Sequence, residues 1–369
     1  MQKIVPRNNN IILILYMFCC ILFLISTTKY LTDYDLINIA GQKDIEQYYL
    51  IAEMSPKLHE NNENILAHVS SRFAIPYIAG AIKNIFSLEL FDTFKYLNFL
   101  FLTLFLIILL YFLNSVTFSL KEKIIFLSLI CLNPYIIRQH LFQPVQVHDL
   151  IFFSLSIIFA KGIIQNKFSL ILFSTLLMIF IRQTSLAFFI GGIIYLIFNK
   201  KKNYKNIIIF FVSFLLTFKI ISMVGNSIST QRFSMNYAYG IFFYDFSQYK
   251  ELIKFLLLPF LSFFPLLILM AGGLKKIKTN DLLVVLVFFI ISALMIAQPI
   301  LGGPIYTQRN VMRIATLSYV ITSLFIFFRF DINKLFQNKY SLFIFLIGLF
   351  LWSLHPLYSI FDFFSILRF

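Results

Sequence analysis

The sequence predicts an all-α, polytopic membrane protein with about eleven transmembrane helices in a single integral membrane domain, residues 1–369. Of the 369 residues, 60% are hydrophobic and only 13% are charged, whereas soluble domains average about 45–50% apolar and about 25% charged residues. The apolar residues form runs close to 20 residues long, the length that a helix needs to cross hydrocarbon. A soluble enzyme, a disordered chain and a secreted disulfide scaffold are therefore excluded.

The apolar runs predict the spans in chain order. They cover residues 10–28, 96–113, 122–137, 149–165, 167–181, 183–199, 206–224, 252–273, 281–298, 311–328 and 340–358. The first run follows a basic segment and has no A-x-A cleavage site after it, which favours an uncleaved signal anchor over a signal peptide.

The basic residues alternate with these spans. With the N-terminus inside, the inner loops hold 16 of the 31 basic residues and three of the 16 acids, which leaves 15 basic and 13 acidic residues outside. Cytoplasmic loops of membrane proteins carry an excess of Lys and Arg. This asymmetry accounts for the formal net charge of +15 without a nucleic-acid partner.

The long polar segment 29–95 is predicted to lie outside the cytoplasm. It contains nine of the 16 acids, and a connection of this length is usually functional or folded. Within it, residues 72–86 are predicted to form an amphipathic helix in the membrane interface.

An acidic motif in this segment is the first candidate for chemistry. On a helix, Asp44, Tyr48 and Ala52 share one face, and a carboxylate backed by an aromatic ring can act as a general base towards a hydroxyl. Glu46 lies two residues further along. The alternative interpretation is a solvated acidic loop that offsets nearby lysines.

The second candidate precedes the fourth predicted span. Pro144 interrupts the helix, and Asp149 stands at its restart, where it serves either as an N-cap or as a second acidic residue of a site. His148 is either an interfacial ring or a ligand. A metal site on His140 and His148 lacks a third ligand with recognisable spacing.

Isolated arginines form the third candidate. Arg182 lies between two apolar runs, either as an anchor that reaches the lipid headgroups or as a bidentate clamp on phosphate oxygens. Arg309 and Arg313 share a helical face by their spacing of four, after a turn predicted at residues 302–304.

Together these motifs resemble the GT-C class of membrane glycosyltransferases, which use lipid-linked sugars as arabinosyl, mannosyl or oligosaccharyl donors. The resemblance covers residues 10–200. The matching segments are Asp44-x-x-x-Tyr48-x-x-x-Ala52, Arg72–Pro76, which opens the juxtamembrane helix, Gln146–Asp149 at the start of a later span, and Arg182–Leu186, where Gln183 replaces the usual Glu.

The resemblance implies transfer of a sugar from a polyprenyl-phosphate donor to an envelope glycan, lipid or protein, on the extracytoplasmic face of a bacterial cytoplasmic (inner) membrane. Asp44 would take the proton of the acceptor hydroxyl. The family's second acid falls on Ile45 here, so Glu46 stays an alternative base.

The resemblance also implies a group that stabilises the charge of the leaving lipid phosphate. Arg182, Arg309 and Arg313 are the cationic candidates. A divalent cation, Mg²⁺ or Mn²⁺, held by Asp44 and Asp149 is the alternative. The hypothesis requires the acidic residues and the arginines to lie around one cavity.

Three other classes of protein stay open. An O-antigen or exopolysaccharide polymerase would place its large outer loop late in the chain. A lipid-linked saccharide flippase or transporter would have interrupted helices and charges near the membrane midplane, for which Lys219 is the candidate. A purely structural membrane protein would leave the acidic loop unexplained.

Overall fold

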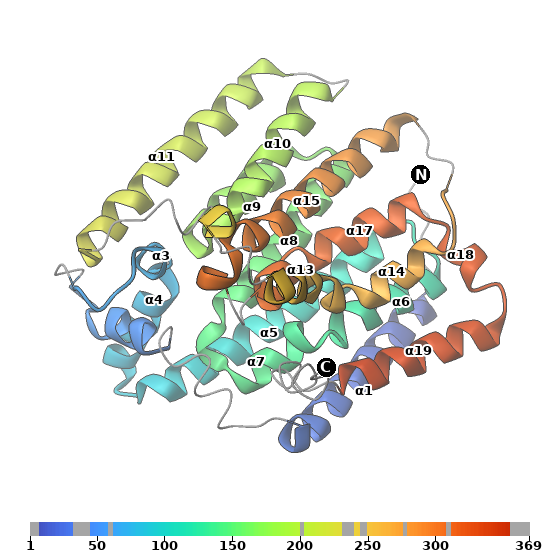
Figure 1. Ribbon diagram of the computed structural model, residues 1–369, viewed down its shortest axis with the longest axis horizontal. Helices are drawn as coiled ribbons and strands as arrows, with labels where there is room; N and C mark the ends of the chain where they lie inside the picture. Colours follow the sequence, from blue (N-terminus) through green and yellow to red (C-terminus); the bar gives the residue numbers. More distant parts are fainter. Residues whose placement is uncertain are drawn as a thin grey trace.

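The computed structural model describes residues 7–31, 45–57, 62–199, 203–230, 240–243, 249–275, 279–307 and 311–354 (Figure 1). Within these ranges the regular elements are helical, and β structure is limited to two isolated bridges, which confirms the all-α class. Residues 45–53 are helical. The other elements are α1 (Arg7–Leu31), α3 (Ala67–Ser70), α4 (Ala74–Phe86), α5 (Leu90–Ser115), α6 (Leu120–Cys131), η1 (Pro134–Arg138), α7 (Gln139–Phe142), η2 (Pro144–Gln146), α8 (His148–Gln165), α9 (Phe168–Ile181), η3 (Gln183–Ser185), α10 (Leu186–Phe198), α11 (Tyr204–Ile228), η4 (Gly240–Phe243), α13 (Tyr249–Ser262), α14 (Phe264–Met270), α15 (Thr279–Thr307), α16 (Val311–Thr316), α17 (Tyr319–Arg329), α18 (Ile332–Leu335) and α19 (Lys339–Ser353).

A helix lies at each predicted apolar run, but fewer of these helices have the length of a span. By length and composition, five stretches in the described ranges could cross a membrane, or six if the α6 and η1–α7 stretches, bent by 43°, form one span. The five are Asn9–Thr28, Leu90–Ser115, Pro144–Gln165, Tyr204–Ile228 and Asp281–Gly302. Shorter apolar helices occur at Phe168–Ile181, Gln183–Phe198, Tyr319–Arg329 and Lys339–Ser353. The count of about eleven spans is not confirmed.

Helix α8 lies at the centre of the bundle. It packs against α5, α9 and α17, and most of its residues are buried. It ends at Asn166, whose φ of 54° lies in the left-handed region, which Asn tolerates better than most residues. The amide of Lys167 then donates to the carbonyl of Gly162 at 2.8 Å, and the chain reverses directly into α9.

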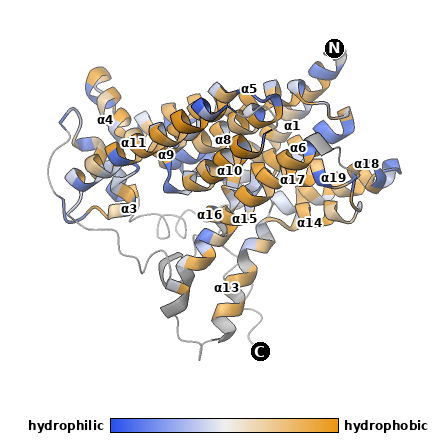
Figure 2. Cartoon of the chain, turned by 90° about the horizontal axis from the view of Figure 1, so that it is seen from above, coloured by the Kyte–Doolittle hydropathy of each residue, from blue (hydrophilic) through white to orange (hydrophobic). Residues whose placement is uncertain are grey.

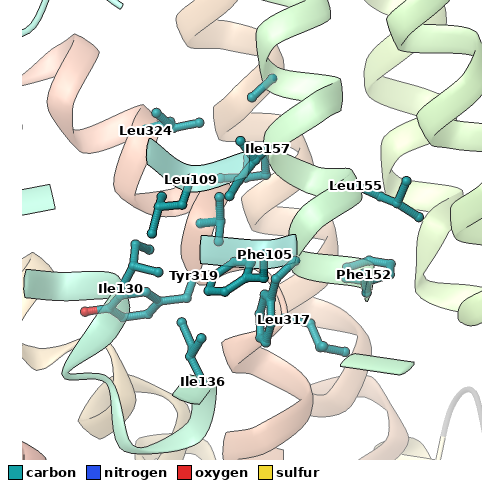
Figure 3. Packing of buried hydrophobic residues seen from close by; sticks show 14 of the residues in the cluster. Phe105, Leu109, Ile130, Ile136, Phe152, Leu155, Ile157, Leu317, Tyr319 and Leu324 are labelled. Atoms are coloured by element: carbon teal, nitrogen blue, oxygen red, sulfur yellow. The ribbon is translucent and has the colours of Figure 1, made fainter. Parts of the chain in front are cut away.

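The core is built from aromatic and branched side chains of several helices. Phe105 of α5, Ile130 of α6 and Tyr319 of α17 lie together beside α8 (Figure 3). On another face of α8, Phe152 meets Phe188 of α10 edge to face, with ring centroids 5.6 Å apart. Aromatic rings therefore fill much of the space around this central helix.

The connection between α6 and α8 is an interrupted helix inside the bundle. Asn133 follows α6, and its Oδ1 accepts a hydrogen bond of 2.9 Å from the amide of Tyr135. Pro134 opens the π-turn η1, and Pro144 opens the 3-10 turn η2. Because prolines lack the amide that continues a helix, the chain changes direction here while still buried.

The polar segment before α5 is folded onto the bundle where the structure describes it. Helix α4 confirms the predicted helix at 72–86. It buries Ile75 and Ala79 and exposes Ile78 and Ile85. At Gly80 any Cβ would collide with the backbone carbonyl of Ala52, so α4 lies directly against the helix at residues 45–53.

The second half of the chain contains further broken helices. Figure 2 shows α13 leaving the layer formed by the other helices, and α13 contains Pro259. The predicted turn at residues 302–304 is wrong, because α15 continues through them to Thr307. The next break separates α16 from α17 and places the short helix α16 against η1, α13 and α15.

Candidate functional site: an arginine–aspartate cluster

The start of α8 carries two adjacent ionisable side chains into the bundle. His148 and Asp149 are both 2% exposed. The prediction that Pro144 interrupts the chain before this helix is confirmed. The N-cap interpretation of Asp149 is wrong, because the N-cap is Val147 and Asp149 lies in the first turn. The Asp149 carboxylate is directed to other elements instead.

Two arginines bind Asp149, one at each oxygen. The Nε and Nη2 atoms of Arg182 lie 2.6 and 2.5 Å from Oδ1. The Nε and Nη2 atoms of Arg313 lie 3.1 and 3.0 Å from Oδ2. Each guanidinium therefore presents two donors to one oxygen, and the carboxylate is held between the two arginines.

Arg182 is deep in the protein, at 3% exposure. The interpretation of this residue as an anchor reaching lipid headgroups is therefore wrong. It occupies the break between α9 and η3 in extended backbone conformation, which turns its side chain away from both helix axes. Burial lowers the pKa of Arg182 to about 10, against the opposing effect of Asp149, so the guanidinium is charged at neutral pH.

His148 extends the cluster towards the N-terminal segment. Its Nε2 lies 3.2 Å from Asp149 Oδ1 and 3.2 Å from Arg182 Nη2. The hydroxyl of Tyr48 is 3.4 Å from the same nitrogen. Arg72 donates from Nη1 to the Tyr48 hydroxyl at 3.3 Å. Tyr48 and Arg72 both belong to the segment before α5. Through the contact of Tyr48 with His148, this segment reaches the centre of the bundle.

We call this group the arginine–aspartate cluster. Its members come from the helical residues 45–53, the turn between α3 and α4, α8, the α9–η3 break and α16. They are Tyr48, Arg72, His148, Asp149, Arg182 and Arg313. The sequence analysis singled out all six, Arg72 only through the resemblance, and the fold brings them together.

Two of these guanidinium groups, those of Arg182 and Arg313, are buried in an apolar bundle, and that of Arg72 is half-buried. Ionisable groups are costly in membrane proteins and are concentrated where a substrate, an ion or a proton is handled. The planar guanidinium is well matched to phosphate oxygens, which it binds in a bidentate manner. The cluster therefore has the chemistry of a site for a phosphate group.

The cluster does not fit a divalent cation. Both oxygens of Asp149 face guanidinium groups, and Mg²⁺ or Mn²⁺ requires such oxygens as ligands. Among the residues that the structure describes, no group of three His, Cys, Asp or Glu side chains could hold a metal ion. Asp149 and His148 thus find no support as metal ligands among the described residues, and Asp44, the other predicted ligand of the divalent cation, lies outside them.

Two predicted site residues, Asp44 and Arg309, lie outside the described residues. Glu46 is exposed, whereas Tyr48 and Ala52 are each 1% exposed. The face predicted to carry Asp44, Tyr48 and Ala52 is therefore the inward face over its described part, and Glu46 is on the other side.

Several buried polar residues near the α6–α8 connection were not singled out for chemistry. Gln139 donates from Nε2 to Oε1 of Gln146 at 2.6 Å. Arg138, fully buried, donates to the carbonyl of Ser353 at the end of α19 and to Oγ1 of Thr27 in α1. The available signal was the concentration of glutamines within a short, otherwise apolar stretch, but their burial depends on the tertiary fold.

Comparison with known proteins adds no further assignment, because no family model, no curated protein and no solved structure matches the chain.

Proposed function

We propose that the protein is a GT-C-like membrane glycosyltransferase. In this proposal it takes a sugar from a polyprenyl-phosphate donor on the extracytoplasmic face of a bacterial cytoplasmic membrane and transfers it to an envelope lipid, glycan or protein. The observation that carries the proposal is that Arg182 and Arg313 both bind Asp149 at the buried start of α8, while Arg72 joins them through Tyr48 and His148. A lipid phosphate is the anion that a site inside a membrane bundle meets.

The proposal assigns the arginines to the donor phosphate. When the sugar carbon is attacked, negative charge develops on the departing phosphate, and preorganised cations lower the barrier for that step. Asp149 holds Arg182 and Arg313 side by side through one carboxylate. We assign it this positioning role rather than that of a general base, since both its oxygens already accept hydrogen bonds.

The proposal assigns the base to Asp44. The acceptor hydroxyl loses its proton to this carboxylate while its oxygen attacks the sugar carbon, and the bond to the phosphate oxygen breaks with inversion. Tyr48, four residues further along the chain, belongs to the cluster through His148 and Arg72, which supports the assignment of a role in the site to this motif. Glu46 is exposed and is the weaker candidate.

The second candidate function is a flippase or transporter of lipid-linked saccharides. It is favoured by the 43° bend between the α6 and η1–α7 stretches and by the buried charges beside it. Discontinuous helices with charges at their ends are typical of transporters. Both candidate functions require the arginines to bind the lipid phosphate. They differ because only the glycosyltransferase transfers the sugar to an acceptor.

Membranes with and without the protein provide the test. Undecaprenyl phosphate carrying radiolabelled glucose, mannose or arabinose is supplied, and the label is followed into lipid, glycan and protein fractions. We expect transfer only with the protein, and transfer at least about 100-fold slower in Asp44→Asn, because a general base contributes about 10²–10⁴-fold. Glu46→Gln is the matched control and should stay near the wild-type rate.

Arg182→Lys keeps the positive charge but loses the planar fork. We expect it to reduce donor use more than it reduces the yield of folded protein. Full activity in both Arg182→Lys and Arg182→Ala would remove the phosphate assignment. Movement of the labelled lipid across the bilayer without any transfer would favour the flippase instead.

A further inference from the structure

Beside the arginine–aspartate cluster, the short helix α7 carries hydrogen-bonding atoms that the fold does not satisfy. Within the part of the chain that the structure describes, neither ring nitrogen of His140 has a hydrogen-bond partner, and neither does Oε1 of Gln139. His140 is 1% exposed and Gln139 is 2% exposed. These are neutral groups, in contrast to the arginines nearby.

A fourth such atom comes from α5. The Nδ2 of Asn98 donates to the backbone carbonyl of His140 at 2.9 Å, while its Oδ1 has no partner among the described residues. Asn98 is 6% exposed. The hydrogen bond fixes α5 against α7, so the amide oxygen and the imidazole belong to one buried neighbourhood.

This neighbourhood adjoins the phosphate-binding arginines. Helix α7 packs against η1 and against η2, the turn that leads into α8. Gln139 is linked to Gln146 by a hydrogen bond of 2.6 Å, and Gln146 ends the turn η2 just before α8 begins. Neutral and cationic groups thus lie next to each other around the start of α8.

Buried polar atoms are nearly always hydrogen-bonded in native proteins, so unsatisfied ones call for a partner. Amide and imidazole groups can both donate and accept, as a sugar hydroxyl does. A carboxylate or phosphate is bound more strongly by guanidinium groups, which the arginines supply and the side chains of α7 do not. The chemistry of α7 therefore matches an uncharged, hydroxylated group.

We propose that Gln139, His140 and Asn98 form the subsite for the neutral sugar ring of the lipid-linked donor, next to the arginines that hold its phosphate. This inference rests on the proposed function and sharpens it, since it specifies a hexose or pentose without charged substituents. The substrate then has two recognition elements, an anionic phosphate and a polyol, each met by a separate group of side chains.

Binding to the full-length protein in lipid nanodiscs tests the subsite. The probes are undecaprenyl phosphate and the same lipid phosphate carrying glucose, mannose or arabinose. Gln139→Leu and His140→Phe keep side-chain volume but remove hydrogen bonds. We expect each to weaken binding of at least one glycosylated lipid by about 3- to 10-fold, the range for loss of a neutral hydrogen bond, with unchanged binding of bare undecaprenyl phosphate.

Ser156→Ala is the matched control, because Ser156 is a buried polar residue of the adjoining helix α8 and its hydroxyl donates to the carbonyl of Phe152 in its own helix. It should alter neither affinity. Equal weakening of both probes by the α7 variants would show a structural role and overturn the subsite. Unchanged binding of both would mean that these atoms hold water only, and would also overturn it.

Arg182→Ala separates the subsite from the proposed function. It should weaken the bare and the glycosylated lipids alike. If it changes neither, or if the wild type binds no lipid phosphate, the proposed function fails, and the subsite fails with it. If Arg182→Ala weakens both while the α7 variants have no effect, the subsite alone is wrong.

Discussion

Helices α8 and α11 are both long and apolar, yet they occupy opposite environments. In the stretch Pro144–Gln165, which contains α8, 78% of the most apolar part is buried inside the protein. In α11 only 17% of the most apolar part is buried. Of the five candidate spans, the window containing α8 is the least hydropathic. Lipid accepts apolar side chains as well as a protein core does, but it excludes polar ones. The helix that carries a histidine and a carboxylate, His148 and Asp149, is the one that other helices surround.

The same difference distinguishes the helix that carries the arginine–aspartate cluster from a helix that exposes apolar side chains. Helix α8 carries His148 and Asp149 at its buried start, and α11 exposes side chains such as Leu216 and Phe218. Polar side chains can be held in fixed positions only where neighbouring helices supply partners. The start of α8 is thus enclosed by partners from other helices, while α11 leaves large apolar side chains exposed.

The largest expected effect on the free energy of unfolding comes from removing the carboxylate at the start of α8. Asp149→Ala leaves Arg182 and Arg313 buried without this carboxylate, and removing one partner of a buried ion pair costs about 3–5 kcal/mol. Denaturant-dependent unfolding of the purified protein in detergent measures the loss. Asp92→Ala is the control, since its pair with Lys95 is about half exposed and such pairs contribute at most about 1 kcal/mol. Similar losses of unfolding free energy in the two variants would contradict the expected difference between a buried and an exposed ion pair.

A smaller effect is expected from truncating one aromatic ring on each helix. Phe152 of α8 is fully buried against Phe188, and Phe218 of α11 is 51% exposed. Phe152→Ala should cost towards the lower end of about 3–5 kcal/mol, because lipid reduces the transfer contribution but not the lost packing. Phe218→Ala should cost under about 1 kcal/mol. The same unfolding measurement applies, and an equal cost for the two would show that α11 is covered in the native protein.

The smallest effect is expected at Lys219, an exposed residue in the middle of α11. Its long side chain can extend along the helix and keep its ammonium group near the membrane surface. Lys219→Met should therefore change the free energy of unfolding by less than about 0.5 kcal/mol and leave sugar transfer unchanged. Strong loss of activity without loss of stability would place this charge in a transport path and favour the flippase.

The site could be predicted to a useful extent from local patterns. Pro144 followed by His148 and Asp149 indicated a helix break with ionisable residues, and the isolated Arg182 stood out in an apolar stretch. These signals are local because a charged residue inside a long apolar run is costly wherever the run packs. They did not reveal how the residues pair, so Asp149 was open as an N-cap and Arg182 as a lipid anchor.

Other features had no local signal. Nothing in the sequence distinguishes Gln139 and Asn98 from other polar residues. Only the contact between α5 and α7 buries them in one neighbourhood. The number of spans also depended on tertiary context, because the run at 122–137 bends by 43° between α6 and the η1–α7 stretch. A hydropathy pattern records how apolar a stretch is and contains no term for a bend inside the bundle.

The sequence by itself determined the membrane class, the all-helical architecture and the positions of the helices, because each depends on composition and on the length of apolar runs. The tertiary structure alone decided which helix is central and which residues meet. Tyr48, Asp149 and Arg313 are separated by 101 and 164 residues along the chain, yet they belong to one cluster. Such long-range pairing arises from helix packing, in which small residues such as Gly80 and breaks such as Pro144 set how closely and at what angle the helices approach.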